Sequence, residues 1–130
     1  LSAFHGDTTQ VTQAQLHLAF FGPAPVATAL IAKLNGTAIG YAGLIPTLVL
    51  HSGETRLDIH HHFVAQDHRG RGVGTALIKA VKHHANTLGV SRLSIGTDPD
   101  NATAIAAYRA MPDLEEITSF GPRFWVKSDR

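Results

Sequence analysis

Short apolar runs alternate with glycine- and proline-containing breaks along this chain. Between residues 27 and 64, three of these runs predict strands, at 27–34, 37–50 and 57–64. Asn35-Gly36 separates the first two runs, and this dipeptide favours the positive φ angles of a two-residue hairpin. The pattern therefore predicts a meander of antiparallel strands, with Pro46 disturbing the second of them.

Helical spacing replaces the strand pattern after Gly74. Apolar residues recur with a helical period between residues 73 and 88, and Gly89 stands where a helix commonly ends. A short apolar run at 91–96 then predicts a strand parallel to strand 57–64. The two strands and the helix between them are expected to form one right-handed β-α-β unit.

Further elements are predicted at both ends of the chain. Residues 8–21 favour a helix, and Asp98-Pro99-Asp100-Asn101 is typical of the start of a second, Ala-rich helix at 102–111. Two runs at 115–119 and 123–127 predict a closing hairpin. The fold class is therefore α/β (α+β): a mixed, largely antiparallel, twisted sheet flanked by helices, in a single domain, residues 1–130.

The sequence Arg69-Gly70-Arg71-Gly72-Val73-Gly74 joins strand 57–64 to the long helix. The start of a helix presents backbone N–H groups and a partial positive charge, and glycines let an anion approach them. Two arginines add positive charge for phosphate oxygens. The alternative is a tight turn eased by glycine, with both arginines in solvent.

Two common nucleotide-binding motifs do not fit this loop. A Walker loop requires Gly-Lys followed by Ser or Thr, which the chain lacks. A Rossmann loop requires a third glycine where Thr75 stands, on the first β-α-β unit of the sheet.

The loop does match another pattern. Arg69-x-x-Gly72-x-Gly74 resembles the (Gln/Arg)-x-x-Gly-x-(Gly/Ala) motif of the GCN5-related N-acetyltransferases, the GNAT superfamily. Phe63-Val64 before the loop and Asn101-x-x-Ala104-Ile105-x-x-Tyr108 after it are similar to further family motifs, and the resemblance covers residues 12–126. The upstream segments FFGPAP, Asn35-Gly36 and Gly40-Tyr41 resemble the subgroup that contains the diamine acetyltransferases.

The resemblance implies acetyl transfer from acetyl-CoA, the cosubstrate, to a primary amine by direct attack. In the family, the strand before the loop splays from the next strand and binds the pantetheine arm, while loop amides hold the pyrophosphate. A backbone N–H near the strand end polarises the thioester carbonyl. The implied cofactor-binding residues are Phe63, Val64, Arg69, Gly70, Arg71, Gly72, Val73, Gly74, Thr75 and Asn101.

Two residues carry the implied catalytic roles. Tyr108 is expected to protonate the leaving thiolate, and the alternative is a tyrosine that packs against the core. His60 is expected to act as the base for the amine, where many family members have a carboxylate. The alternatives are that His60 only lines the acceptor pocket while water takes the proton, or that Asp58 is the base.

The strand alternation makes a further prediction about this strand. It places Asp58, His60 and His62 on one face, and Ile59, His61 and Phe63 on the other. Two imidazoles at i and i+2 would suit a metal if a third ligand converged, but no metal is assigned. Tyr41 and Trp125 are interpreted as packing residues outside the site.

Composition narrows the classes of molecule that the chain is expected to bind. The net charge of +1 gives no broad basic field, so neither nucleic acid nor a membrane surface is expected as a partner. The chain has no cysteine and no apolar run long enough to span a bilayer, and the expected location is cytoplasmic. The expected partner is a small-molecule amine or a protein amine. The competing hypothesis is a non-catalytic acyl-CoA-binding or sensing domain.

Two departures from the family pattern stand out. The chain begins with Leu1, too late for the family's first strand, so that strand is either truncated or replaced by another segment or by the partner in a homodimer. Met111-Pro112-Asp113 stands where the family has Gly-Phe, which is expected to displace the strand that follows.

Overall fold

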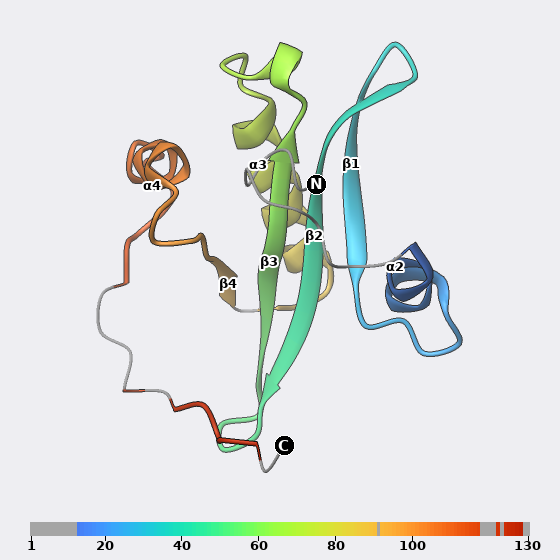
Figure 1. Cartoon of the computed structure of the whole chain (residues 1–130), viewed down its shortest axis with the longest axis vertical. Coiled ribbons are helices and arrows are strands. Elements are labelled where there is room, and N and C mark those ends of the chain that lie inside the picture. Colours follow the sequence, from blue (N-terminus) through green and yellow to red (C-terminus); the bar gives the residue numbers. More distant parts are fainter. Residues whose placement is uncertain (1–12, 91, 118–121, 123, 129–130) are drawn as a thin grey trace. The chain divides into compact units, whose positions relative to one another are not determined.

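The computed structural model describes residues 13–90, 92–117, 122 and 124–128. The chain divides into two compact units, one ending at Asp98 and the other beginning at Pro99, and each is described by itself. The elements in chain order are α2 (Gln13–Phe21), β1 (Thr28–Leu34), β2 (Thr37–Val49), β3 (Glu54–Val64), the 3-10 helix η1 (Gln66–His68), α3 (Val73–Thr87), β4 (Arg92–Ile95) and α4 (Ala102–Arg109) (Figure 1).

The first unit contains a four-stranded sheet in the order β1-β2-β3-β4. β1 and β3 are both antiparallel to β2, whereas β4 is parallel to β3. The predicted meander and the β-α-β unit made by β3, α3 and β4 are therefore confirmed, as is the mixed, largely antiparallel fold class.

The turns follow the local sequence closely. Asn35 and Gly36 have φ angles of 50° and 80°, which confirms the predicted two-residue hairpin between β1 and β2. Pro46 pairs with Leu57 without a register shift, so the predicted disturbance at this proline is wrong. The irregularity lies between Gly43 and Leu44 instead, because β3 carries an extra residue there.

α3 packs against one face of the sheet and makes contacts with all four strands (Figure 1). Leu44, Leu57 and Ile59 from the sheet are buried together with the apolar stripe of α3, which consists of Leu77, Ile78, Val81 and Ala85. Burial of each large side chain stabilises the fold by about 1.5–3 kcal/mol. This packing fixes the start of α3 relative to the end of β3.

α2 leads directly into the sheet. It ends at Phe21, and the backbone N–H groups of Val26 and Ala27 both donate to the carbonyl of Ala19, at 2.9 and 3.0 Å. The predicted helix at 8–21 is confirmed from Gln13 onward, and residues 8–12 lie outside the described part. None of the described helices is long and apolar enough to cross a bilayer.

The second unit contains α4. Asn101 caps this helix, because its side-chain oxygen accepts a hydrogen bond from the Ala104 N–H at 3.1 Å. At the other end, the Arg109 guanidinium donates two hydrogen bonds to the Glu116 carboxylate, at 2.6 and 3.0 Å. The predicted cap is confirmed.

The closing hairpin predicted at 115–119 and 123–127 is wrong for the residues that the structure describes. Residues 115–117 and 124–127 are not in strands, while 118, 119 and 123 lie outside the described part. Phe124, Trp125 and Val126 are 86–99% exposed, so the interpretation of Trp125 as a packing residue is also wrong. An apolar run becomes a strand only where a neighbour pairs with its backbone, and composition does not supply that neighbour.

Candidate functional site

β3 has two neighbours along its first half and one along its second. β4 pairs with residues 56–59, whereas β2 pairs with β3 from Glu54 to Val64. The two parallel strands therefore part after Ile59, as the resemblance implied. The Ala65 N–H donates to Ile39 of β2 at 2.7 Å, so the preceding N–H, that of Val64, faces away from β2.

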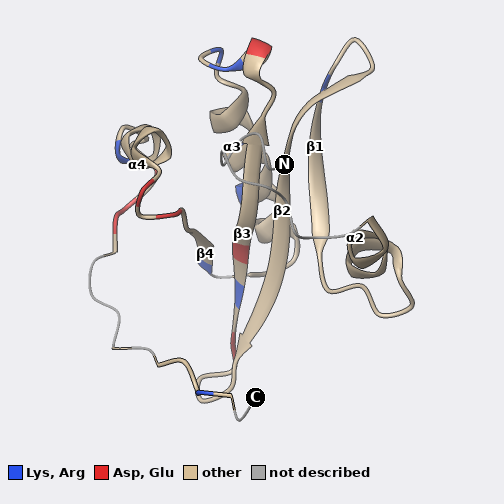
Figure 2. Cartoon of the chain, viewed as in Figure 1, with Lys and Arg blue, Asp and Glu red and all other residues tan. Residues whose placement is uncertain are grey.

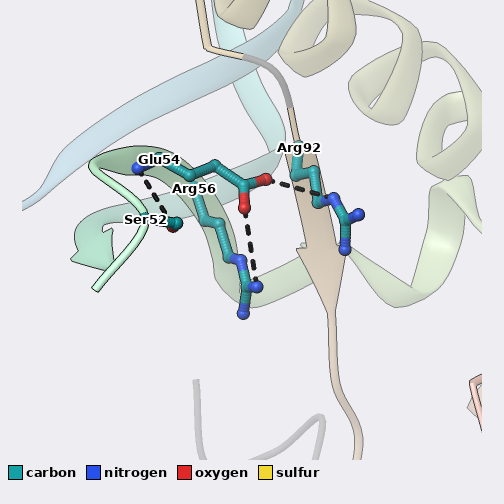
Figure 3. A network of polar contacts seen from close by, with 4 residues as sticks. All are labelled: Ser52, Glu54, Arg56 and Arg92. Carbon is teal, nitrogen blue, oxygen red and sulfur yellow. Dashed lines mark hydrogen bonds and ion pairs between the residues drawn. The ribbon is translucent and has the colours of Figure 1, made fainter. Parts of the chain in front are cut away.

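A polar cluster holds β3 and β4 together before they part (Figure 3). The Glu54 carboxylate forms an ion pair with Arg92 of β4 at 3.1 Å and lies 3.7 Å from the Arg56 guanidinium. The Ser52 hydroxyl accepts a hydrogen bond from the Glu54 N–H at 3.2 Å. These contacts join the strands at one end of β3, opposite the end where the glycine loop begins.

A β-bulge lies where the strands part. Gly43 pairs with His61 and Leu44 with Ile59, so the register skips His60. The extra residue reverses the alternation of side chains beyond it. The prediction that His62 shares a face with Asp58, and His61 a face with Ile59, is therefore wrong.

The contacts of the two histidines show the reversal directly. The His62 Nε2 lies 3.1 Å from the carbonyl oxygen of Gly74, at the start of α3, so His62 is on the face that α3 covers. Burial lowers the pKa of His62, and the hydrogen bond to Gly74 opposes this change. His61 is on the opposite face, with Tyr41.

Glycine suits the three loop positions for different physical reasons. Gly70 and Gly72 have φ angles of 74° and 83°, a left-handed conformation that side chains disfavour. Gly74 instead makes room, because a Cβ there would lie 3.3 Å from the His62 ring. Gly72 is the N-cap of α3 and has no side chain to cover the N–H groups of the first helical turn.

The two loop arginines differ in their surroundings. Arg69 Nε donates to the Val64 carbonyl at 2.9 Å, and its guanidinium lies 5.8 Å from the centre of the Phe63 ring. Arg69 therefore holds the loop against the end of β3. Arg71 and Thr75 are exposed, and Figure 2 shows blue, basic positions in this loop next to a red, acidic position in η1.

His60 lies at the surface. Its side chain is 65% exposed, and its Nε2 is 3.9 Å from the Asp58 carboxylate. Asp58 also accepts a hydrogen bond from the Ser94 hydroxyl of β4 at 2.9 Å. Within the described part of the chain, no group of three or more His, Asp or Glu residues could hold a metal ion.

Sequence reasoning missed a pair of side chains on the face of the sheet that α3 does not cover. The Tyr41 hydroxyl lies 2.8 Å from the His61 Nδ1, and the two rings stack with centroids 5.5 Å apart and planes inclined by 17°. Burial raises the pKa of Tyr41 to about 12. The interpretation of Tyr41 as a packing residue overlooked this contact, because the alternation placed His61 on the other face.

Tyr108 lies on α4, in the second unit, and is half-buried. Burial raises the pKa of its phenol, which therefore keeps its proton at neutral pH. A protonated phenol can act as a proton donor.

The first prediction concerns Gly72. A Gly72→Ala variant forces a side chain into a left-handed conformation and should lower the free energy of unfolding by about 1–2 kcal/mol in urea titrations. Gly96→Ala is the matched control, because Gly96 has no positive φ and no atom near an added Cβ. Equal losses in the two variants would show that the loop conformation does not depend on Gly72.

The second prediction concerns pH. His62 has a lowered pKa in the folded chain, so the unfolded chain binds this proton first as the pH falls below the ordinary value of about 6.5. Stability should therefore decline from that pH down to the folded pKa. Urea unfolding at about pH 8 and about pH 5 should show a smaller decline in His62→Gln than in wild type. A decline that is reduced as much by His83→Gln, on the exposed side of α3, would contradict this assignment.

Comparison with known families gives one extended match. The model of the acetyltransferase (GNAT) family matches residues 3–111. Human N-acetyltransferase 8 is 30% identical over 81 residues, which is 62% of this chain and 36% of that protein. The L-2,4-diaminobutyric acid acetyltransferase of Nocardia farcinica is 33% identical over 84 residues, 65% of this chain and 42% of that protein. The chain thus spans less than half the length of these relatives.

Solved structures support the fold. An aminoglycoside acetyltransferase from an uncultured soil metagenomic sample, in complex with sisomicin, superposes with a TM-score of 0.78 at 16% identity, covering 97% of this chain and 83% of that one. An aminoglycoside N-acetyltransferase in complex with CoA superposes with a TM-score of 0.60 at 24% identity, covering 79% and 81%. At these identities the likeness shows the fold alone.

Proposed function

The chain belongs to the acetyltransferase (GNAT) family, and we propose that it transfers an acetyl group from acetyl-CoA to a primary amine by direct attack. One observation carries the proposal. β3 parts from β4 after Ile59, and the strand end beyond it leads into a glycine loop that opens α3. A strand edge beside a helix N-terminus suits a ligand that carries both amides and phosphates.

The loop would hold the pyrophosphate. Backbone N–H groups of Val73, Gly74 and Thr75 belong to the first turn of α3, where helical partners are absent and the helix dipole favours an anion. Arg71 would add a charge-assisted contact, and the Thr75 hydroxyl would be a further donor. Gly70 would keep the loop open, and Arg69 would position the loop through its hydrogen bond to Val64.

The end of β3 would bind the pantetheine arm. The Val64 N–H faces away from β2 and would donate to a pantetheine carbonyl or polarise the thioester. Phe63 would present its backbone along the same edge. Asn101 would add its side-chain amide from the start of α4.

The chemistry would be a single transfer. The amine nitrogen forms a bond with the thioester carbonyl carbon, the carbon–sulfur bond breaks, and CoA leaves as a thiolate. Tyr108 would donate its proton to that thiolate, and the raised pKa of its phenol means that this proton is in place before CoA leaves. His60 is the base that the sequence predicts, and its Nε2 lies 3.9 Å from the Asp58 carboxylate.

The acceptor would be a small-molecule amine or a protein amine. One relative is named for L-2,4-diaminobutyric acid and one structural neighbour contains sisomicin, so these two amines open the acceptor screen. A peptide with N-terminal alanine follows from a neighbour described as a ribosomal-protein-alanine N-acetyltransferase. We place the activity in the cytoplasm and in one domain, residues 1–130, and we propose a homodimer as its assembly.

The third prediction tests cofactor binding. Calorimetric titration with acetyl-CoA should give a dissociation constant that rises at least about tenfold in Arg71→Ala, because a charge-assisted contact contributes about 1.5–3 kcal/mol. Lys82→Ala, the same charge change on the exposed side of α3, is the control and should leave binding unchanged. Absence of binding to the wild-type chain would refute the proposed function.

Turnover separates the enzyme from the competing hypothesis of a non-catalytic acyl-CoA sensor. The wild-type chain should release CoA in the presence of an accepted amine. Tyr108→Phe should keep acetyl-CoA affinity while turnover falls by about 10²-fold, the usual effect of losing a general acid. Binding without turnover for every amine tried would favour the sensor.

A further inference from the structure

We infer that Tyr41 and His61 together take up the proton of the acceptor amine, with Tyr41 passing it to His61 Nδ1. This inference rests on the proposed acetyl transfer and deepens it. It begins from the contact between the two side chains, an oxygen-to-nitrogen distance of 2.8 Å between stacked rings.

The pair lies at the point where the proposed cofactor slot opens. His61 follows the skipped residue of the bulge, beyond the last residue of β3 that pairs with β4. Tyr41 comes from β2, opposite Phe63. Both rings are on the face of the sheet that α3 does not cover, and both side chains are half-buried rather than part of the core.

Gly43 lies beside the paired rings. It stands opposite His61 in the register, and a Cβ at this position would lie 3.4 Å from Cε2 of Tyr41 and 3.7 Å from Cβ of His61, which are ordinary van der Waals distances. The pair therefore sits next to the bulge, where the register of β2 and β3 shifts.

His61 is held more firmly than His60. The His60 side chain is 65% exposed, and its contact with Asp58 is a 3.9 Å ion pair rather than a hydrogen bond. A proton acceptor works best when its lone pair is already oriented toward the proton. The stacked phenol supplies that orientation for His61 alone.

The protonation states follow from the burial of Tyr41. The 2.8 Å contact fits either tautomer of His61, and burial keeps the Tyr41 phenol protonated at neutral pH. In the inferred relay the hydroxyl donates to Nδ1, and neutral His61 carries its proton on Nε2. The only lone pair of that ring then points at Tyr41. A proton must therefore reach His61 through the tyrosine oxygen.

The proton moves in one concerted step. As the amine nitrogen bonds to the acetyl carbon and the thiolate leaves, one N–H proton passes to the Tyr41 oxygen. The Tyr41 hydroxyl proton passes at the same time to His61 Nδ1, which leaves neutral tyrosine and an imidazolium. Beyond the bulge, His61 shares a face of β3 with Asp58.

The first experiment needs no acceptor. Ring nitrogen shifts of ¹⁵N-histidine-labelled protein, assigned with His61→Gln, should show neutral His61 with its proton on Nε2. In Tyr41→Phe the same ring should become a mixture of both tautomers. A proton on Nδ1 in wild type, or no change in Tyr41→Phe, would overturn the inference while leaving the proposed function intact.

The second experiment uses two amines of nearly equal shape, ethylamine and 2,2,2-trifluoroethylamine, with acetyl-CoA. The trifluoroethylammonium ion is far more acidic, so this amine needs less help in losing its proton. Tyr41→Phe and His61→Gln should lower kcat/KM for ethylamine by about 10²-fold and for trifluoroethylamine only a few-fold. For wild type, kcat/KM for ethylamine should rise with pH as the base loses its proton. In Tyr41→Phe and His61→Gln this rise should disappear.

A control variant and three contrary results complete the test with these two amines. His83→Gln on α3 should leave both amines unaffected. Equal losses for the two amines would mean that the pair is structural. A loss confined to His60→Gln would return the role to His60. A wild-type chain that neither binds acetyl-CoA nor acetylates either amine would refute the proposed function instead, because the tautomer of His61 is measured independently.

Discussion

The site depends on the length over which β3 is paired with both β2 and β4. Main-chain N–H and C=O groups need hydrogen-bond partners, and β4 provides them only along residues 56–59. The cluster around Glu54 fixes β4 at one end, and α3 packs across the sheet so that its first turn lies against the other end of β3. The strand end and the helix N-terminus are thereby brought together by packing on the same core.

A single extra residue then decides which side chains serve that site. Because the register skips His60, His62 turns toward α3 and becomes a half-buried contact of Gly74, while His61 lies on the opposite face and contacts Tyr41. One imidazole thus contributes to the stability of the loop, and its neighbour is the proton acceptor that we propose. Gly72 allows a turn with a positive φ, and Gly74 allows the close approach of the His62 ring.

Much of this could be predicted from the sequence, since it is local. The hairpin at Asn35-Gly36, the helix from Val73 and the cap at Asn101 depend on residues adjacent in the chain. The faces of His61 and His62 could not be predicted, because a bulge arises from pairing with β2 and leaves no local signature. Tyr41 was missed for the same reason. The hairpin expected after α4 failed because apolar alternation does not supply a pairing partner.

The strand end and the loop together form the proposed acetyl-CoA site. Hydrogen exchange of single amides, followed by NMR with and without acetyl-CoA, tests this site most directly. We expect exchange to slow at Val64, whose N–H faces away from β2, and at Val73, Gly74 and Thr75, while amides of β1 keep their rates. Binding that leaves these four amides unchanged would contradict this site and place the ligand elsewhere on the chain.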